Sequence, residues 1–413
     1  MSEWRTRAAR VIPGGASTGS KRPDALFGPQ APADAPTHYV RAHGCRVVAT
    51  DGREYTDLTA ALGAVAFGYA DAEVDDAALR AARDGAVCGL ASVHEVTLAE
   101  RLTATIPSAQ AVRFLKSGAE ACQAAVRIAR AHTGRSLVLG SGYFGWLDWW
   151  NPHVAGVPAG AAADWRAMPF DDIAAWEEAF DEVGDRLAAV IVEPLVETWG
   201  SVAWLQSLRD RCDAVGAVLI MDEIKTCCRL HVGGAQARLG VTPHLTTIGK
   251  AIANGWPLAA VVGDAHVMQA ATRTWISGTL AGETTAIAAA HAVLDRHARE
   301  DVCGALARTG RALRGAVRTT LDAHGLTDVA DFGDDAMWGL RWHDAGEHDR
   351  FVAAARAGGV LLKRGAYQFA LLAHDDEAMA RVADAVTHAA RTVASMRDDR
   401  RGIRPSDRLV EGA

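Results

Sequence analysis

Short apolar runs alternate with helical patterns between about residues 60 and 300, and this alternation limits the possible folds more than any other feature of the sequence. The runs that predict strands are residues 112–115, 136–140, 187–193, 217–223 and 258–263. Uninterrupted apolar runs suit strands that are covered on both faces. The helical segments 119–134 and 202–216 each end in glycine, a common helix stop. The pattern predicts an α/β fold, with a mainly parallel central sheet covered by helices.

The flanking regions have a different pattern. Residues 46–58 place Asp-Gly between two β-rich runs, which predicts a hairpin. After about residue 300, helices surround short strands near 336–342 and 359–372, and a helix from about 375 to 396 precedes a polar tail. The 413 residues, 49% of them hydrophobic, provide enough core for two domains. We therefore expect a smaller α+β domain after the large one.

The charge and cysteine content exclude several classes of protein. The net charge of −7 gives no basic field for nucleic acid or an anionic membrane surface. No apolar signal core or membrane-spanning run is present in the sequence. The seven cysteines include no CxxC pair, so we expect reduced thiols, no metal site and a cytoplasmic location.

Lys250 is the only charged residue between Leu239 and Gly263. A phosphate-binding P-loop is excluded, because Ala251 follows the Gly-Lys pair and Gly240 lies nine residues before Gly249. A lysine that snorkels to solvent normally has polar neighbours on its helix face, and none here is charged. The remaining interpretation is an ammonium destabilised by low dielectric, whose lowered pKa makes it a nucleophile. Because structural lysines are commoner than catalytic ones, this segment leaves both roles open.

Asp222 and Glu223 end the apolar run 217–223. In open parallel sheets, ligands bind at the carboxyl ends of the strands. The alternative is an acid that caps the following turn. Asp222 and Lys250 are 28 residues apart, which is enough for one connection within a single sheet.

A strand, a Ser-Gly pair and a helix follow one another at residues 112–134. Ser117 is a candidate N-cap, and the N–H groups of Gly118, Ala119 and Glu120 would then face a bound phosphate. An ordinary helix start explains the same residues, so this motif alone does not decide between them.

Residues 140–150 match GxGxxG just after a strand, which makes a nicotinamide dehydrogenase a rival interpretation. A dinucleotide site needs a helix that opens at the third glycine. Asp148, Asn151 and Pro152 interrupt the segment that follows, which argues against it. The aromatic residues of this stretch predict a wall on which a flat ring stacks, or alternatively a buried aromatic core: Tyr143, Phe144, Trp146, Trp149 and Trp150.

A phosphate cradle, a stacking aromatic residue, a buried acid and an isolated lysine are together what pyridoxal phosphate (PLP) requires. The lysine forms a Schiff base with the aldehyde of PLP, and the acid keeps its pyridine nitrogen protonated.

The sequence resembles the class III, fold-type I PLP-dependent aminotransferases, nearest the glutamate-1-semialdehyde 2,1-aminomutase branch. The resemblance extends from "IPGG" (12–15) to residues 373–386, and its most specific part is Asp222-Glu223 followed by residues 233–263. It implies an N-terminal segment (1–60) that joins a C-terminal small domain (301–413), with a large PLP-binding domain at 61–300.

The resemblance also implies roles for individual residues. Lys250 would be the Schiff-base lysine and proton shuttle, Asp222 would pair with the pyridine nitrogen, and Tyr143 and Ile224 would pack on the ring. Gly278 and Thr279 would reach the phosphate of the partner subunit, which implies a homodimer with shared sites. The full predicted cofactor-binding set is Ser117, Gly118, Ala119, Tyr143, Phe144, Glu193, Asp222, Ile224, Lys250, Gly278 and Thr279.

Departures from the family pattern lie mainly on the substrate side. Phe144 replaces a histidine, Ala119 replaces a threonine, and "KTCCR" (225–229) replaces Met-Thr-Gly-Phe-Arg. Residues 364–374 lack the gating glutamate of the aminomutase. Substitutions at Leu62 and Thr198 also separate the chain from that enzyme. The predicted substrate-side residues are Lys21, Arg22, Leu62, Trp146, Thr198 and Arg229.

These departures favour transamination between a small-molecule amino donor and a ketone or aldehyde by a ping-pong mechanism, in which PLP alternates with pyridoxamine phosphate. The alternatives are an aminomutase, a PLP-dependent racemase or decarboxylase, an NAD-dependent dehydrogenase, and a non-catalytic protein with the PLP-binding fold.

Overall fold

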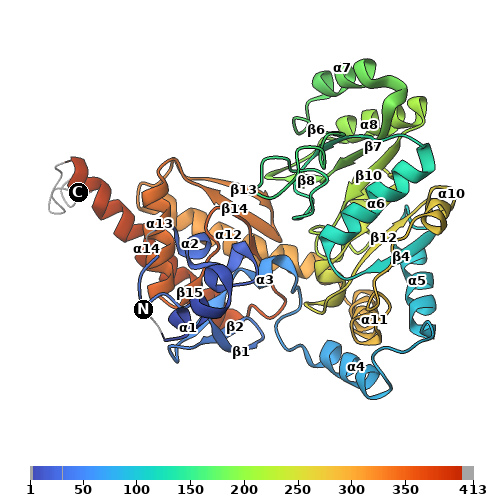
Figure 1. The fold of residues 1–413 in the computed structure, drawn as a ribbon. Coiled ribbons are helices and arrows are strands. Elements are labelled where there is room, and N and C mark those ends of the chain that lie inside the picture. Colours follow the sequence, from blue (N-terminus) through green and yellow to red (C-terminus); the bar gives the residue numbers. More distant parts are fainter. Residues whose placement is uncertain (1–2, 30, 402–413) are drawn as a thin grey trace. The chain divides into compact units, whose positions relative to one another are not determined.

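The computed structural model describes residues 3–29 and 31–401, which divide into two compact units. The first unit draws on residues 1–71 and 305–413, and the second is Ala72–Gly304. Each unit has its own sheets and core (Figure 1). The domain limits predicted at residues 60 and 300 stay predictions. Residues 397–401 of the predicted polar tail continue the last helix, which ends at Arg401, and the rest of the tail lies outside the described residues.

The second unit is built around a seven-stranded sheet with the order β4-β12-β11-β10-β7-β5-β6. All neighbouring strands are parallel except those that pair with β12, which runs antiparallel to both β11 and β4. This confirms the predicted α/β fold with a mainly parallel sheet. The strands are β4 (Ala111–Leu115), β5 (Leu137–Ser141), β6 (Trp165–Ala167), β7 (Leu187–Val192), β10 (Val218–Asp222), β11 (Leu245–Ile248) and β12 (Ala259–Gly263).

Two strands of this sheet were not expected from the sequence. β6 has only three residues, and β11 has four, of which two are threonines. Neither contains an apolar run long enough to predict a strand, yet β11 is an interior strand, between β12 and β10, and is completely buried. A separate two-stranded sheet pairs β8 (Leu195–Val196) with β9 (Thr198–Trp199).

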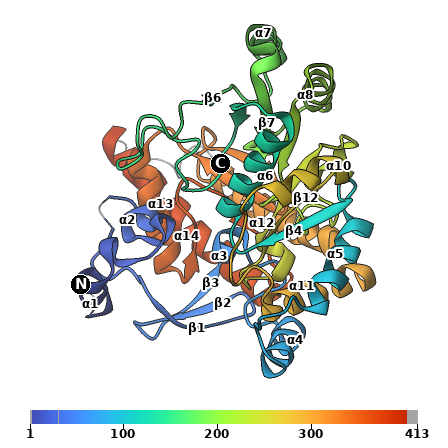
Figure 2. The same ribbon diagram turned by 45° about the vertical axis from the view of Figure 1, so that its right-hand side comes forward.

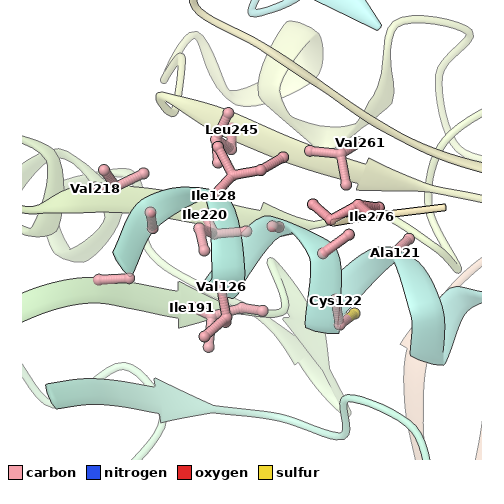
Figure 3. Close-up of a cluster of buried hydrophobic side chains, with 14 of the residues drawn as sticks. Ala121, Cys122, Val126, Ile128, Ile191, Val218, Ile220, Leu245, Val261 and Ile276 are labelled. Atoms are coloured by element: carbon pink, nitrogen blue, oxygen red, sulfur yellow. The ribbon is translucent and has the colours of Figure 1, made fainter. Parts of the chain in front are cut away.

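Helices of the second unit cover both faces of the sheet, and the buried side chains form a separate apolar cluster on each face. Ile191 and Ile220 pack under α6, as Figure 3 shows, whereas the adjacent Val190 and Leu219 face α7 and α8. The helices are α4 (Ala72–Arg83), α5 (Val93–Thr105), α6 (Gly118–Thr133), α7 (Ile173–Val183), α8 (Val202–Val215), α9 (Gly234–Leu239), α10 (Ala265–Met268) and α11 (Thr284–Arg299), with 3-10 turns η3 (Gly184–Arg186), η4 (Lys250–Ala253) and η5 (Gln269–Arg273).

The predicted glycine stops of two of these helices are confirmed. Gly134 and Gly216 follow α6 and α8 in the left-handed conformation, with φ of 72° and 68°. Glycine adopts this conformation without the steric cost that a Cβ imposes. At the edge of the unit, α4 lies beside α11 (Figure 2).

The first unit contains two small sheets with the orders β1-β2-β3-β15 and β13-β14-β16. The predicted hairpin is confirmed, because β2 and β3 pair in antiparallel fashion. The strands are β1 (Tyr39–His43), β2 (Arg46–Ala49), β3 (Glu54–Asp57), β13 (Ala330–Asp334), β14 (Met337–Arg341), β15 (Val360–Leu361) and β16 (Gln368–Phe369). The helices are α1 (Glu3–Val11), α2 (Pro23–Phe27), α3 (Ala60–Gly63), α12 (Val302–Ala323), α13 (Ala345–Ala357) and α14 (Asp376–Arg401), with 3-10 turns η1 (Pro13–Gly15) and η2 (Gly19–Lys21).

No helix in the described part of the chain combines the length and apolar character needed to traverse a bilayer. The seven cysteines are free thiols, as expected.

Candidate active site

Three neighbouring parallel strands bring the strongest candidates to one edge of the large sheet. Glu193 directly follows β7, Asp222 ends β10, and Lys250 opens η4 two residues after β11. β10 pairs with β7 on one side and with β11 on the other, and Asp222 is in register with Thr247. The carboxyl ends of these strands therefore place both acids beside the lysine, as expected for ligand sites in parallel sheets.

Lys250 has an unusual backbone and an unusual electrostatic environment. Its φ of 52° lies in the left-handed region, which non-glycine residues rarely adopt outside functional or tightly constrained sites. Burial, followed by the positive charge of Lys225, lowers the pKa of Lys250 to about 8. The interpretation of Lys250 as an amine with a lowered pKa therefore agrees with the structure, and no snorkelling helix carries it.

The carboxylate of Asp222 is 5% exposed and is held by three donors. Its Oδ1 accepts hydrogen bonds from the Ile224 N–H (3.0 Å) and the Thr247 hydroxyl (3.1 Å), and its Oδ2 accepts from the Cys122 thiol (3.3 Å). Burial and the negative charge of Glu193 raise the pKa of Asp222 to about 6. A cationic partner would therefore favour its ionised form.

Burial and Asp222 itself raise the pKa of the Cys122 thiol well above its ordinary value, so this thiol stays protonated and acts as a donor. Cys122 lies in α6 and Thr247 in β11, and neither was identified from the sequence. The spacing of Cys122, one turn after Gly118, is the signal that could have shown that it faces the same site.

The adjacent acid, Glu223, has a structural role. Its fully buried carboxylate accepts the N–H groups of Ala235 and Gln236 and the hydroxyl of Thr226. It thereby fixes the start of α9 to the turn after β10. The capping interpretation considered for both acids therefore applies fully to Glu223, while Asp222 accepts one N–H of the following turn and is otherwise oriented by side chains from two other elements.

The start of α6 confirms Ser117 as the N-cap. The Glu120 N–H donates to Ser117 Oγ at 3.3 Å, and the Glu120 carboxylate accepts the Ser117 N–H at 2.8 Å. Of the three N–H groups predicted to face a phosphate, that of Glu120 is therefore engaged. The N–H groups of Gly118 and Ala119 have no acceptor among the residues that the structure describes. They leave a helix N-terminus that can bind an anion.

The loop after β5 approaches this helix start closely. A Cβ on Gly145, whose φ is 91°, would lie 2.3 Å from the Cβ of Ala119, so the close approach requires glycine here.

The same loop decides the dinucleotide-site interpretation. Residues 142–164, all of them described, form no helix. The crossover helix that a dinucleotide site requires is therefore absent, and the dehydrogenase interpretation loses its basis.

The aromatic stretch in this loop divides into exposed and buried residues. Tyr143 is 66% exposed and its N–H donates to Glu193 Oε1 at 2.7 Å, and Trp146 is also exposed. Phe144 is 1% exposed and packs against Trp149 and two further tryptophans. The buried aromatic core therefore applies to Phe144, whereas the stacking role of Tyr143 and the predicted cofactor contact of Phe144 stay predictions.

The remaining predicted residues lie in several places. In the second unit, Ile224 is half-buried beside Asp222, Thr198 is exposed in β9, and Gly278 and Thr279 are exposed before α11. Arg229 is fully buried, and burial lowers its pKa to about 10. Lys21, Arg22 and Leu62 belong to the first unit, where the first two are exposed and Leu62 is half-buried in a left-handed turn.

The site fits the polar groups of PLP. Asp222 offers a buried carboxylate to a protonated pyridine nitrogen, Lys250 an amine to the aldehyde, and the N–H groups of Gly118 and Ala119 a place for the phosphate.

Comparison with known proteins identifies the family. The aminotransferase class-III family model matches residues 29–145 and 146–389. The chain belongs to the class-III aminotransferases. A glutamate-1-semialdehyde 2,1-aminomutase of Thermomicrobium roseum is 33% identical over 422 aligned positions, covering 94% of this chain and 97% of that protein.

Two solved structures of this fold are also similar. The FumI protein of Sphingopyxis sp. MTA144 in its PLP internal aldimine form superposes with a TM-score of 0.90 at 27% identity, over 98% of this chain and 99% of that chain. A transaminase with PLP bound gives 0.86 at 27% identity, over 95% and 97%. The class-III family and its PLP-containing neighbours support PLP as the cofactor and fold type I as the fold of this chain, as predicted.

Proposed function

We propose that this class-III enzyme is a transaminase that moves an amino group from an amino donor to a ketone or aldehyde by a ping-pong mechanism. The observation that carries the proposal is the placement of Lys250, with its lowered pKa, beside Asp222 at the ends of adjacent strands. A neutral amine at this position is the nucleophile and the base that amino transfer requires.

Each residue of the site has a separate role in the proposed reaction. Bound PLP supplies the electron sink for a carbanion at the substrate carbon. Lys250 holds the aldehyde carbon of the cofactor and moves the proton at the substrate carbon. Asp222, oriented by Cys122 and Thr247, holds the proton at the pyridine nitrogen. The N–H groups of Gly118 and Ala119 bind the phosphate.

Sequence departures support transamination over intramolecular amino exchange. Leu62, Thr198 and residues 364–374 differ from the aminomutase pattern on the substrate side, while the cofactor residues Asp222 and Lys250 are retained. The second candidate is an aminomutase, which the 33% identity to the Thermomicrobium roseum protein supports.

The test is donor dependence. Purified protein loaded with PLP should absorb visible light, and borohydride should abolish this band and fix the cofactor to Lys250. With an amino donor and a keto acceptor it should release the donor's keto acid in amounts equal to the amine formed. Lys250→Ala should lower this rate by about 10²–10⁴-fold or more.

Other outcomes would identify the alternatives. Conversion of glutamate-1-semialdehyde without an amino donor would establish the aminomutase. Release of carbon dioxide or racemisation of the donor would point to a decarboxylase or racemase, and binding without turnover would point to a non-catalytic protein. Normal transamination by Lys250→Ala would refute the proposal.

We also propose that the enzyme is a homodimer. Gly278 and Thr279 line an open cavity of about 980 Å³, together with residues before and within the first turns of α5, residues of β4 and others of the segment 276–284. Leu90, Val93 and Leu280 are exposed around it, by 82%, 73% and 55%. Apolar exposure of this kind marks an interaction surface. Sedimentation at twice the chain mass is expected, and a monomer at assay concentrations would refute it.

A further inference from the structure

Lys116 directly precedes the Ser117 cap of α6, and its side chain reaches the start of a different helix. Its ammonium donates to Glu283 Oε1 at 2.7 Å, and Glu283 is the N-cap of α11. The two side chains are 20% and 12% exposed, so water screens this ion pair less than a surface pair. Charge-assisted hydrogen bonds of this length are among the stronger ones in proteins. The pair therefore connects the start of α6 to the start of α11.

Further hydrogen bonds fix both ends of this connection. The N–H groups of Lys116 and Ser117 donate to Glu120 Oε2 at 3.1 Å and 2.8 Å. The carboxylate of Glu283 also accepts two N–H groups in the first turn of α11, at 3.1 Å and 2.9 Å. Movement of either partner would therefore disturb the helix start to which it belongs.

The two helix starts carry the residues that we propose for the cofactor phosphate. The N–H groups of Gly118 and Ala119, the phosphate cradle, open α6. Gly278 and Thr279 belong to the segment 276–284, which leads into α11. Lys116 thus joins the element that holds the cradle to the element that we propose reaches the phosphate of the partner subunit.

The segment 276–284 is held at both ends from β4. At one end the Arg113 guanidinium of β4 donates to the Ile276 carbonyl, and at the other the Lys116 ammonium, directly after β4, holds Glu283. Residues 277–280 between these contacts are exposed. The strand that leads to the phosphate cradle therefore also anchors the exposed part of the segment.

We propose that Lys116 and Glu283 are positioning residues for the cofactor phosphate, and that their ion pair sets the segment 276–284 relative to the phosphate cradle. The inference rests on the proposed phosphate site and the proposed homodimer. In a symmetric dimer each phosphate receives a cradle from one subunit and a segment from the other, so the same ion pair aligns both contributions. Neither side chain touches the cofactor in this role.

The variants separate positioning from the effect of charge alone. Lys116→Met removes the charge and the pair, and Lys116→Arg keeps both. Glu283→Gln breaks the ion pair, leaves the Lys116 charge and retains a carbonyl oxygen that can accept from the first turn of α11. Charge alone predicts tighter binding of a phosphate in Glu283→Gln, because a nearby negative charge is removed, whereas positioning predicts weaker binding.

Asp264→Asn is the matched control. Asp264 is the N-cap of α10, where its carboxylate accepts two N–H groups of the first turn. It follows Gly263, which pairs with Leu245 at the start of β11, so it lies at the opposite edge of the sheet from Lys250. This variant removes the charge of a helix cap without altering the site. Circular dichroism and thermal unfolding establish that each variant is folded.

The readout is the Kd of PLP and that of pyridoxal, which lacks the phosphate, measured from the visible band as each is titrated into full-length protein freed of cofactor. Lys116→Met and Glu283→Gln should each raise the Kd of PLP by about tenfold, the equivalent of one hydrogen bond, and leave that of pyridoxal within about twofold. Lys116→Arg and Asp264→Asn should leave both Kd values near those of wild type.

Two results would overturn the inference. One is unchanged or tighter binding of PLP by Glu283→Gln, and the other is an equal loss of affinity for PLP and pyridoxal. Failure of the proposed function is a separate result, because it is seen in the wild-type protein, as a monomer in sedimentation or as no amino transfer from a donor. The inference is decided by the ratio of the two Kd values in the variants.

Discussion

Two buried aspartates, each at the end of a strand, have different roles in this protein. Asp57 ends β3 in the first unit and is 2% exposed. Its Oδ1 accepts the N–H (2.9 Å) and hydroxyl (2.7 Å) of Thr59, and its Oδ2 accepts the Ala60 N–H (3.0 Å) and the Tyr69 hydroxyl (2.5 Å). Both oxygens are therefore saturated by groups of the chain that follows.

Within the described part of the chain, Asp222 in the second unit accepts one backbone N–H, that of Ile224, and otherwise depends on a thiol and a hydroxyl from two other elements. A thiol is a weak donor, so the ionised carboxylate is less well compensated than that of Asp57. The comparison indicates that the hydrogen-bond donors around an acid at a strand end, more than its burial, determine whether the acid has a structural role or a role in the chemistry.

The turns beside the two aspartates also differ in strain. Ala60, Ala61 and Leu62 have φ of 47°, 49° and 62°, three consecutive non-glycine residues in the left-handed region. Each costs about 1–2 kcal/mol. The Tyr69 hydroxyl accepts the Ala61 N–H at 2.9 Å while donating to Asp57. Asp57 and Tyr69 therefore stabilise a strained turn of three consecutive residues. Near Asp222 the left-handed residues are isolated: Cys228 in the turn after β10, and Lys250 and Asn254 at the two ends of η4.

The largest expected effect is on catalysis. Asp222→Asn keeps the size of the side chain and removes the charge that holds a proton at the pyridine nitrogen. The transamination rate should fall by about 10²–10⁴-fold. Its free energy of unfolding at pH 7 should not fall, because burial and Glu193 raise the pKa of Asp222 and so make its charge costly. Steady-state kinetics and urea unfolding of the same preparation measure both quantities.

A loss of stability in Asp222→Asn as large as that of the equivalent change at Asp57 would contradict the division of roles. A rate within about threefold of wild type would contradict the chemical role of Asp222.

The next effect is on stability. Asp57→Asn replaces an oxygen that accepts two hydrogen bonds with an amide group that donates, opposite donors that are themselves buried. The free energy of unfolding should fall by about 2–3 kcal/mol. Urea unfolding measures it, with exposed Asp76→Asn in α4 as the control, expected within about 0.5 kcal/mol of wild type. Equal stability of the Asp57 variant and the control would show that the turn is held by other contacts.

The sequence alone was sufficient to predict the features that depend on a local pattern of residues. The apolar strands β7 and β10, the Ser117 cap and the glycine stops at Gly134 and Gly216 were predicted, because each depends on residues within a few positions of one another. β11 was missed, because four residues with two threonines become a central strand only through their neighbours in the sheet.

The candidate site was predicted from the sequence only in part. Lys250 was singled out as the lone charge in an apolar segment, and Asp222 as an acid at the end of an apolar run. Cys122, Thr247 and the pairing of Lys225 with Glu193 were not, because each joins residues from different elements. A thiol in a helix and a lysine in a turn have no local signal for such contacts.

The smallest expected effect is a change in the free energy of unfolding when Lys250, the proposed catalytic lysine, is replaced. Because burial lowers the pKa of Lys250 to about 8, against about 10.4 in an unfolded chain, the unfolded state binds more protons between these pH values. The contribution of Lys250 to stability therefore rises with pH through this window, and its full cost in free energy of unfolding is present below about pH 8.

Lys250→Met should raise the free energy of unfolding of cofactor-free protein at pH 7 by about 2 kcal/mol, while abolishing transamination. The difference should disappear above about pH 10. Urea unfolding at about pH 7, 9 and 10.5 measures it, with the exposed Lys21→Met as the control. A destabilised Lys250→Met would show that the ammonium is better compensated than the charges around it indicate, and that the contrast with Asp57 does not extend to the lysine.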